Sequence, residues 1–175
     1  MINKKGLSDV VTTVILIVIT ISAISIVWVV INNVVGEKLE ETKSCFDIFG
    51  KVEINDVYTC YRTSDEELDV SINTKVSLDE LLVSISSKKG SKSFKLTKEG
   101  SSESFVRPYG DNTNYGDSLR IPSEGEGLTY VVNVLTAGIR PNPEDLGDFL
   151  SINIVPSANG KVCDVADSYV GVKKC

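Results

Sequence analysis

The sequence contains no histidine. Histidine is the commonest general base, proton carrier and zinc ligand of proteins, so most catalytic and zinc-binding arrangements are excluded. A Ser–His or Cys–His nucleophile cannot be built from this chain. Paired carboxylates remain available, but Asp and Glu lie in polar stretches such as SDEELD (64–69), which are typical of a solvated surface. The sequence therefore predicts a protein that is not an enzyme and that holds no cofactor or metal.

Basic residues are in the minority. The chain has 18 Lys and Arg against 24 Asp and Glu, for a net charge of −6. Lys4 and Lys5 precede the first acidic residue, Asp9, so the rest of the chain is acidic. An acidic domain repels phosphate backbones, and nucleic acid is therefore not an expected partner. The sequence also lacks any Asn-x-Ser/Thr signal for N-glycosylation.

A long run without charge, from Val10 to Gly36, follows the two lysines. A helix needs about 20 apolar residues to cross a bilayer core, whereas the apolar region of a cleaved secretory signal has roughly 7–15. In lipid, a single segment can satisfy its backbone hydrogen bonds only as a helix. We therefore expect a membrane helix with Lys4 and Lys5 on the cytoplasmic side and the acidic domain outside.

Good helix formers in GEKLEETKS (36–44) extend this helix, which we expect to run from about Ser8 to about Thr42. At ~1.5 Å per residue it is longer than one crossing requires. Small or hydroxylated residues along it would let helices approach closely in an apolar medium, unless they are only tolerated positions in a lone anchor. These residues are Thr12, Thr13, Thr20, Ser22, Ala23 and Ser25.

The stretch KKGLSDVVTTVILIVITISAISIVWVV (4–30) resembles the N-terminus of archaeal type IV pilins. In that family a prepilin peptidase removes a short basic leader that ends in glycine, on the cytoplasmic side, and the apolar helix is retained. The resemblance implies a leader at residues 1–6, recognised through Lys4, Lys5 and Gly6, with Leu7 as the mature N-terminus.

The resemblance further implies the lollipop architecture of pilins, with an N-terminal helix (7–44) and an extracellular domain (45–175). The precursor would sit in membrane lipid until an assembly platform and its ATPase extract it. Its helix would then pack against those of identical subunits in a filament core, through contacts that are heterologous and do not close. The candidate core-packing residues are Val14, Ile17, Ile21, Ile24, Trp28 and Ile31.

The start of the mature helix departs from the bacterial pilin pattern. Bacterial pilins carry a glutamate a few residues into the mature chain, which neutralises the terminal amine of a neighbour. This chain has Val11 there, with Ser8 and Asp9 close by. Asp9 could act on the amine in the same way, but we favour capping of the helix start. The departure favours an archaeal over a bacterial pilin.

The remainder of the chain, residues 45–175, is predicted to be all-β and sandwich-like. Its short β-rich runs are FDIFGKVEI (46–54), VYTCYR (57–62), LDVSINTKV (68–76), LLVSISS (81–87), SFKLT (93–97), LTYVVNVL (128–135) and FLSINIV (149–155). Turn signals separate several of them: KKGSK (88–92), PNPEDLGD (141–148) and Asn159-Gly160.

Four cysteines, Cys45, Cys60, Cys163 and Cys175, lie in this domain. An even number outside the membrane predicts two disulfides with three possible connectivities. Their spacing permits the local pairs Cys45–Cys60 and Cys163–Cys175. It also permits the nested pairs Cys45–Cys175 and Cys60–Cys163, which would arise if the first and last strands ran antiparallel side by side. We favour the nested pairs because they tie the end of the chain to the junction between helix and domain. A four-cysteine zinc site is a weaker alternative, because the close spacing of a zinc knuckle is missing.

The longest stretch without strand character is 98–127, and a loop of this length is usually functional or disordered. Its large side chains suit contact with neighbouring subunits or with an external surface or glycan, unless they only cover the domain edge. The candidates are Phe105, Arg107, Tyr109, Tyr115 and Arg120. The residues Asp111, Asn112, Asn114 and Asp117 suggest calcium, although their spacing does not match the EF-hand pattern.

The sequence thus favours a structural subunit of an extracellular, adhesive pilus-like filament. Three alternatives remain. One is a single-span membrane protein with an external binding domain. Another is a minor pilin or pseudopilin of a secretion or motility machine. The third, a secreted hydrolase, is disfavoured by the missing histidine.

Overall fold

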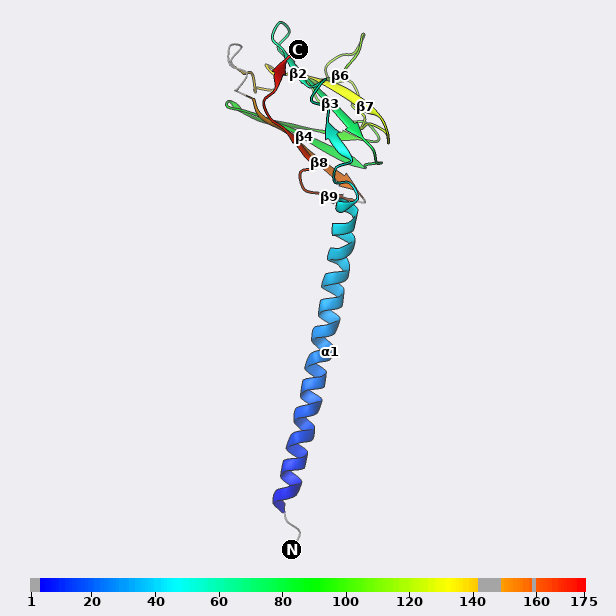
Figure 1. The fold of residues 1–175 in the computed structure, drawn as a ribbon, viewed down its shortest axis with the longest axis vertical. Coiled ribbons are helices and arrows are strands. Elements are labelled where there is room, and N and C mark those ends of the chain that lie inside the picture. The colour runs from blue at the N-terminus through cyan, green and yellow to red at the C-terminus, as the bar shows by residue number, and fades with distance from the viewer. Residues whose placement is uncertain (1–3, 142–148, 159) are drawn as a thin grey trace. The chain divides into compact units, whose positions relative to one another are not determined.

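A computed structural model describes residues 4–141, 149–158 and 160–175. The chain divides into two compact units, Met1–Lys43 and Ser44–Cys175. Helix α1 runs from Lys4 to Phe46, so that only its last turn belongs to the second unit (Figure 1). All strands of the described chain lie in the second unit. The predicted order of an N-terminal apolar helix and a mostly β C-terminal domain is therefore confirmed.

Helix α1 is longer than expected at both ends. It begins at Lys4 and ends at Phe46, beyond the predicted limits of Ser8 and Thr42. Its section Val11–Asn33 is long and apolar enough to cross a membrane, a property that signal sequences share. Because the helix starts at Lys4, Ser8 and Asp9 lie inside it rather than at its first residue. Capping by Asp9 was expected for a chain that begins at Leu7, and it stays a prediction.

The second unit contains two sheets. The first, sheet A, has the strand order β11-β2-β3-β7-β6, and β1 also pairs with β3. Its strands are β1 (Val52–Ile54), β2 (Cys60–Arg62), β3 (Glu67–Thr74), β6 (Val106–Pro108), β7 (Gly127–Asn133) and β11 (Lys173–Lys174). The second, sheet B, has the order β10-β8-β4-β5, with β9 beside β8. Its strands are β4 (Glu80–Ser87), β5 (Gly90–Thr97), β8 (Phe149–Ala158), β9 (Lys161–Val162) and β10 (Asp167–Tyr169).

One hydrophobic core joins the two sheets. In β4, Leu81, Val83 and Ile85 are fully buried and alternate with partly exposed residues, as expected for a strand with one face on the core. Leu68, Val70 and Ile72 of β3 belong to the same core. Large aromatic side chains fill the space between the sheets, where the ring of Phe94 lies 6.4 Å from that of Phe105 and 6.2 Å from that of Tyr130.

The turn signals are tested at two places. Strands β4 and β5 form a hairpin in which Ser87 pairs with Gly90, so the turn falls at the start of KKGSK. Strands β8 and β9 pair at Ala158 and Lys161, and Gly160 has a φ of +72°, a backbone conformation that favours glycine. Asn159 and residues 142–148, most of the PNPEDLGD signal, lie outside the described residues.

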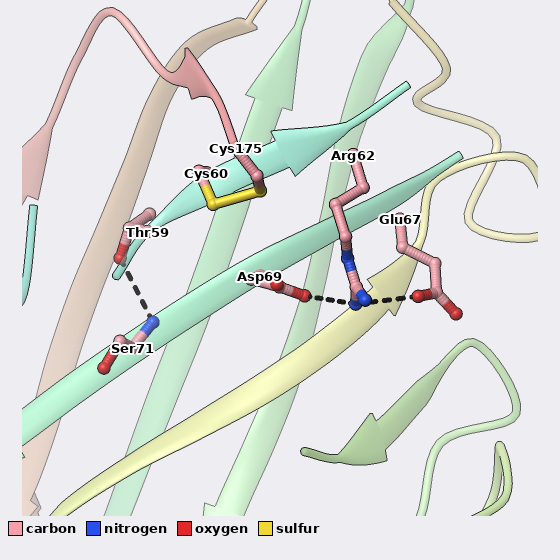
Figure 2. The surroundings of a disulfide bond; sticks show 7 residues. All are labelled: Thr59, Cys60, Arg62, Glu67, Asp69, Ser71 and Cys175. Carbon is pink, nitrogen blue, oxygen red and sulfur yellow. Dashed lines mark hydrogen bonds and ion pairs between the residues drawn. A yellow bond between two sulfur atoms is a disulfide. The ribbon is translucent and has the colours of Figure 1, made fainter. Parts of the chain in front are cut away.

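Two predicted strands are shorter than expected. In the first, Phe46 ends α1 and residues 47–51 form a turn. In addition, β1 and β2 pair with the same edge of β3 and leave a gap between them at Ser71. The backbone N–H of Asn55 donates to the carbonyl oxygen of Ser71 at 2.8 Å. The N–H of Ser71 donates to Oγ1 of Thr59 at 3.1 Å (Figure 2). Since both backbone groups of Ser71 are satisfied in this way, residues 56–58 leave the sheet, and Val57 and Tyr58 become exposed.

The hydroxyl of Thr59 should stabilise the sheet at this gap, because it accepts the hydrogen bond of the Ser71 N–H. Thr59 is fully buried, so Thr59→Val would keep the shape of the side chain but leave the N–H of Ser71 buried without an acceptor. We expect the free energy of unfolding to fall by about 1–3 kcal/mol, measured by urea denaturation of the full chain in detergent. Thr63→Val, at an exposed position, serves as the control and should change it by less than about 0.5 kcal/mol. An equal effect of both substitutions would contradict this role.

Candidate functional site

The apolar section of α1 presents its side chains on all sides. From Val11 to Ile31 the large apolar residues are 48–67% exposed, and none of the span Val11–Asn33 is buried. A helix that is apolar all round belongs either in a membrane or in the core of a larger assembly. All six predicted core-packing positions, Val14 to Ile31, lie on this exposed surface.

The hydroxyl side chains of this helix are turned back onto its own backbone. Oγ1 of Thr20 donates to the carbonyl oxygen of Ile17 at 2.8 Å, and Oγ of Ser22 donates to that of Val18 at 2.7 Å. Ser25 does the same with Ile21 at 2.8 Å. Polar groups satisfied within the helix can enter an apolar medium at little cost. The helix therefore suits lipid or a dry helix–helix contact.

The predicted leader boundary lies within α1. Lys4, Lys5, Gly6 and Leu7 form its first residues. This places the predicted cleavage bond in the first helical turns of the uncleaved chain.

The four cysteines form two disulfides, as predicted, but they pair differently from either expected arrangement. Cys45 is bonded to Cys163 and Cys60 to Cys175, with Cα–Cα distances of 5.4 and 5.0 Å. Neither the local pairs nor the favoured nested pairs occur; the third connectivity does. The nested arrangement required antiparallel first and last strands. Instead, β11 pairs with β2 in parallel, Lys173 opposite Cys60, which brings Cys175 beside Cys60 (Figure 2).

The disulfides also exclude the alternative of a zinc site. Cysteine binds zinc as a thiolate, and no cysteine is free. The sulfur atoms of Cys60 and Cys175 and a carboxylate oxygen of Asp69 do lie within 4.8 Å of one another. Because both sulfurs belong to the disulfide, this cluster has only Asp69 as a ligand.

The predicted loop 98–127 is more ordered than expected, because β6 and two isolated bridges anchor it. Thr97 pairs with Arg120, and Ser101 pairs with Leu119. The segment after β6 covers the face of β3 that points away from the core, where Glu67 and Asp69 are only 11% and 10% exposed. A group of charged side chains therefore holds this part of the chain in place.

Glu67 is the centre of this group. Its carboxylate pairs with Nη2 of Arg62 at 2.8 Å and with Nη2 of Arg107 at 3.2 Å, and it accepts a hydrogen bond from the hydroxyl of Tyr115. The same Nη2 of Arg62 lies 2.7 Å from Oδ1 of Asp69 (Figure 2). Burial raises the pKa of Asp69, against the opposing effect of Arg62. Burial, followed by the hydrogen bond to Glu67, also raises the pKa of Tyr115.

The predicted contact residues therefore divide into two kinds. Phe105 is 3% exposed and packs on Phe94, so its interpretation as a contact residue is wrong. Arg107 and Tyr115 face Glu67 and serve the structure of the loop. Tyr109 remains a surface residue, with 62% of its side chain exposed. Glu67 and Asp69 were interpreted as solvated surface in SDEELD (64–69), and this is wrong, because both are buried, with 9% and 7% of the whole residue exposed.

Tyr109 borders an open groove of about 470 Å³, which also contacts Arg120, Thr129 and Tyr130. A second hollow of about 410 Å³ shares Arg120. Arg120 is held by Glu126 through Nη1 at 2.7 Å, and this bond holds the pKa of Glu126 at about 2. The groove thus combines an exposed aromatic ring, hydroxyls and an arginine whose charge is neutralised by Glu126.

The calcium hypothesis gains no support. Asn114 and Asp117 bond to each other, the N–H of Asn114 donating to Oδ2 of Asp117 at 2.7 Å. Asn112 has a φ of +65° in the turn before them. Among the described residues, these acidic groups do not gather into a set of metal ligands.

Comparison with known proteins yields no relative: no protein-family model, no curated protein and no solved structure matches this chain.

The connectivity can be checked directly by mass spectrometry of the oxidised protein. Trypsin separates the four cysteines into peptides 44–51, 52–62, 162–173 and the C-terminal residues after Lys173. We expect peptide 44–51 linked to 162–173, and peptide 52–62 linked to Cys175. The reduced digest is the control. A link between 44–51 and 52–62 would contradict the structure.

The Glu67 group should determine the stability of the loop. Glu67→Gln removes the charge that Arg62 and Arg107 share, and we expect the free energy of unfolding to fall by about 2–3 kcal/mol. Amide exchange should also rise at residues such as Gly116, which donates to Val106. Glu53→Gln, which breaks an exposed pair with Lys75, is the matched control and should cost less than about 1 kcal/mol. Equal exchange in both variants would refute the role of Glu67.

Proposed function

We propose that this chain is the structural subunit of an extracellular filament of the archaeal type IV pilin kind. It is made as a membrane-anchored precursor and cut after Gly6. The observation that carries the proposal is the uncovered apolar surface of α1 between Val11 and Asn33.

The free energy of burying that surface determines which surroundings the helix can have. Burying about 20 large apolar side chains contributes roughly 1.5–3 kcal/mol each, or tens of kcal/mol before entropy is counted. The rest of the described chain covers none of this surface. Lipid covers it in the precursor. In the filament the helices of other copies take the place of lipid.

The residues along the helix suit a change from contact with lipid to contact with other helices. Small and hydroxylated side chains such as Ser22, Ala23 and Ser25 allow close approach of neighbouring helices. The hydroxyls already have partners in their own backbone, so leaving lipid for a helix–helix contact leaves none of the three bonded hydroxyls unpaired.

Cleavage changes the position of Asp9. In the precursor it lies inside α1, whereas after removal of residues 1–6 it is the third residue of the mature chain. There it can act on the positive helix start, or on a neighbour's amine. The partners of this route are the prepilin peptidase, the assembly platform with its ATPase, and further copies of the chain.

Surface adhesion is the use we propose for the filament. The domain is held by two disulfides, as is typical of proteins outside the cell. The groove beside Tyr109 is the candidate contact for an external surface or glycan.

A second candidate is a single-span membrane protein whose external domain binds a ligand and never polymerises. It is favoured by the same observation, since a helix that is apolar all round fits lipid equally well. A minor pilin or pseudopilin of a secretion or motility machine shares the same processing.

The N-terminus of the protein from its native cells distinguishes these functions. We expect intact mass and terminal sequencing to show Leu7 as the first residue, and sheared cell-surface fibres to contain the chain. Gly6→Val should leave Met1 in place and abolish the fibres, while Ile2→Val, the control inside the leader, should change neither. A wild-type chain that keeps Met1 to Gly6 would instead establish the membrane-anchored protein.

A further inference from the structure

Exposed apolar side chains gather in two segments of the second unit. Among its described residues, all strongly exposed large apolar side chains except Tyr109 and Leu135 lie in 46–58 or 162–170. We call these residues the apolar edge: Phe46, Phe49, Val57, Tyr58, Val162, Val165 and Val170. Phe46 and Phe49 are 77% and 70% exposed, and Val57 and Tyr58 are 76% and 65% exposed.

The two segments are joined to each other along their length. The disulfide Cys45–Cys163 links them at Phe46 and Val162. Further along, the N–H of Ile54 donates to Oδ2 of Asp167 at 2.8 Å. The disulfide Cys60–Cys175 and the pairing of β11 with β2 then bring them together again. The exposed residues between these links therefore lie on two segments that run beside each other.

Hydrogen bonds of the nearby backbone explain why the side chains of this edge are exposed. Val57 and Tyr58 protrude because Asn55 and Thr59 satisfy the backbone of Ser71. Phe49 lies in a turn in which its N–H donates to the carbonyl oxygen of Cys45. Rigid attachment on both sides makes this a preformed surface, and a partner can bind it without first ordering it.

The exposed side chains of the apolar edge add up to a large apolar area. Its three aromatic side chains alone leave roughly 300–500 Å² of surface uncovered, given about 150–250 Å² for a whole aromatic side chain. Isolated soluble proteins rarely expose a contiguous apolar patch of more than a few hundred Å². With its four valines, the edge approaches the ~800 Å² that each partner contributes to a standard protein interface.

Lipid does not fit this surface. Charged residues from Glu37 to Lys43 separate it in sequence from the apolar span that ends at Asn33. Asp47, Asp56 and Asp164 stand among its apolar residues, and acidic groups are repelled by anionic membranes.

We propose that the apolar edge binds a second copy of this chain, as the contact between neighbouring domains when the helices assemble. The inference rests on the proposed filament, which places many identical domains side by side. In a filament the contact is heterologous: the apolar edge of one copy meets a different surface of the next. In that contact the rings of Phe46, Phe49 and Tyr58, which are exposed in the single chain, become buried. They then act as the aromatic anchors typical of a protein interface.

Photo-crosslinking of the full chain tests this contact. ¹⁵N-labelled chain with p-benzoylphenylalanine in place of Tyr58 is co-assembled with unlabelled chain and irradiated. Mass spectrometry of the digest then separates links between copies from links within one copy. The same photoreactive residue in place of Thr63, at an exposed polar position, is the control. We expect links from position 58 to peptides of the unlabelled copy, at least about tenfold more abundant than from position 63.

A second variant measures the contribution of the contact. Val57→Ser with Tyr58→Ser should raise the concentration of chain needed for assembly by about tenfold, while Leu135→Ser, at an exposed apolar position outside the edge, should not. Val57, Tyr58 and Leu135 are all exposed, so we expect these substitutions to leave the fold intact. Links from position 58 only within one copy, to lipid or to another protein would overturn the proposal, as would unchanged assembly of the double variant.

The two proposals can fail separately. A chain that begins at Leu7 and forms fibres, but gives no links between copies at position 58, overturns the apolar edge alone. A chain that keeps Met1 and forms no fibres, yet links between copies in the membrane, overturns the filament and leaves the contact between copies in place.

Discussion

The main constraint on this protein is the apolar surface of α1 between Val11 and Asn33, none of which is buried by the described residues. Between Val11 and Asn33 the backbone bonds are closed within α1, and Thr20, Ser22 and Ser25 add their hydroxyls to the same carbonyls. Such a segment is stable only where water is excluded. The acidic β domain that follows keeps its own core and is closed by its own disulfides. The helix is thus free to change its surroundings while the domain stays folded.

The domain protects itself against unwanted pairing at the end of sheet B. Strand β5 ends that sheet and carries Lys92 and Lys95, with Lys98 just beyond it. Lys95 and Lys98 pair with Glu80 and Asp79, whereas the ammonium of Lys92 lies 4.9 Å from the ring centre of Phe105. Charged residues on an edge strand, especially those that point inward, prevent another strand from adding to the sheet. These lysines thus disfavour the addition of a strand at β5.

Local patterns predicted the elements, but not the contacts between distant parts. The uncharged run and the alternation in LLVSISS (81–87) depend only on neighbouring residues, and the helix and the strand that they predict are both present. The disulfide pairing depends on whether β11 runs parallel or antiparallel to β2, and no local pattern carries that direction. Phe105 and Tyr109 looked alike in sequence, because only the packing of β6 on β7 and of Phe105 on Phe94 separates the buried ring from the exposed one.

The pairing of Cys45 with Cys163 also has a mechanical consequence. It closes residues 45–163 into a covalent ring whose first member lies in the last turn of α1. A pull between that turn and any point within the ring, such as Tyr109, is divided between two arms of the chain. The longer arm cannot be drawn out to its full length, because the shorter arm becomes taut first. An open chain under tension would extend strand by strand. Here the extension between the two points is limited by the length of the shorter arm.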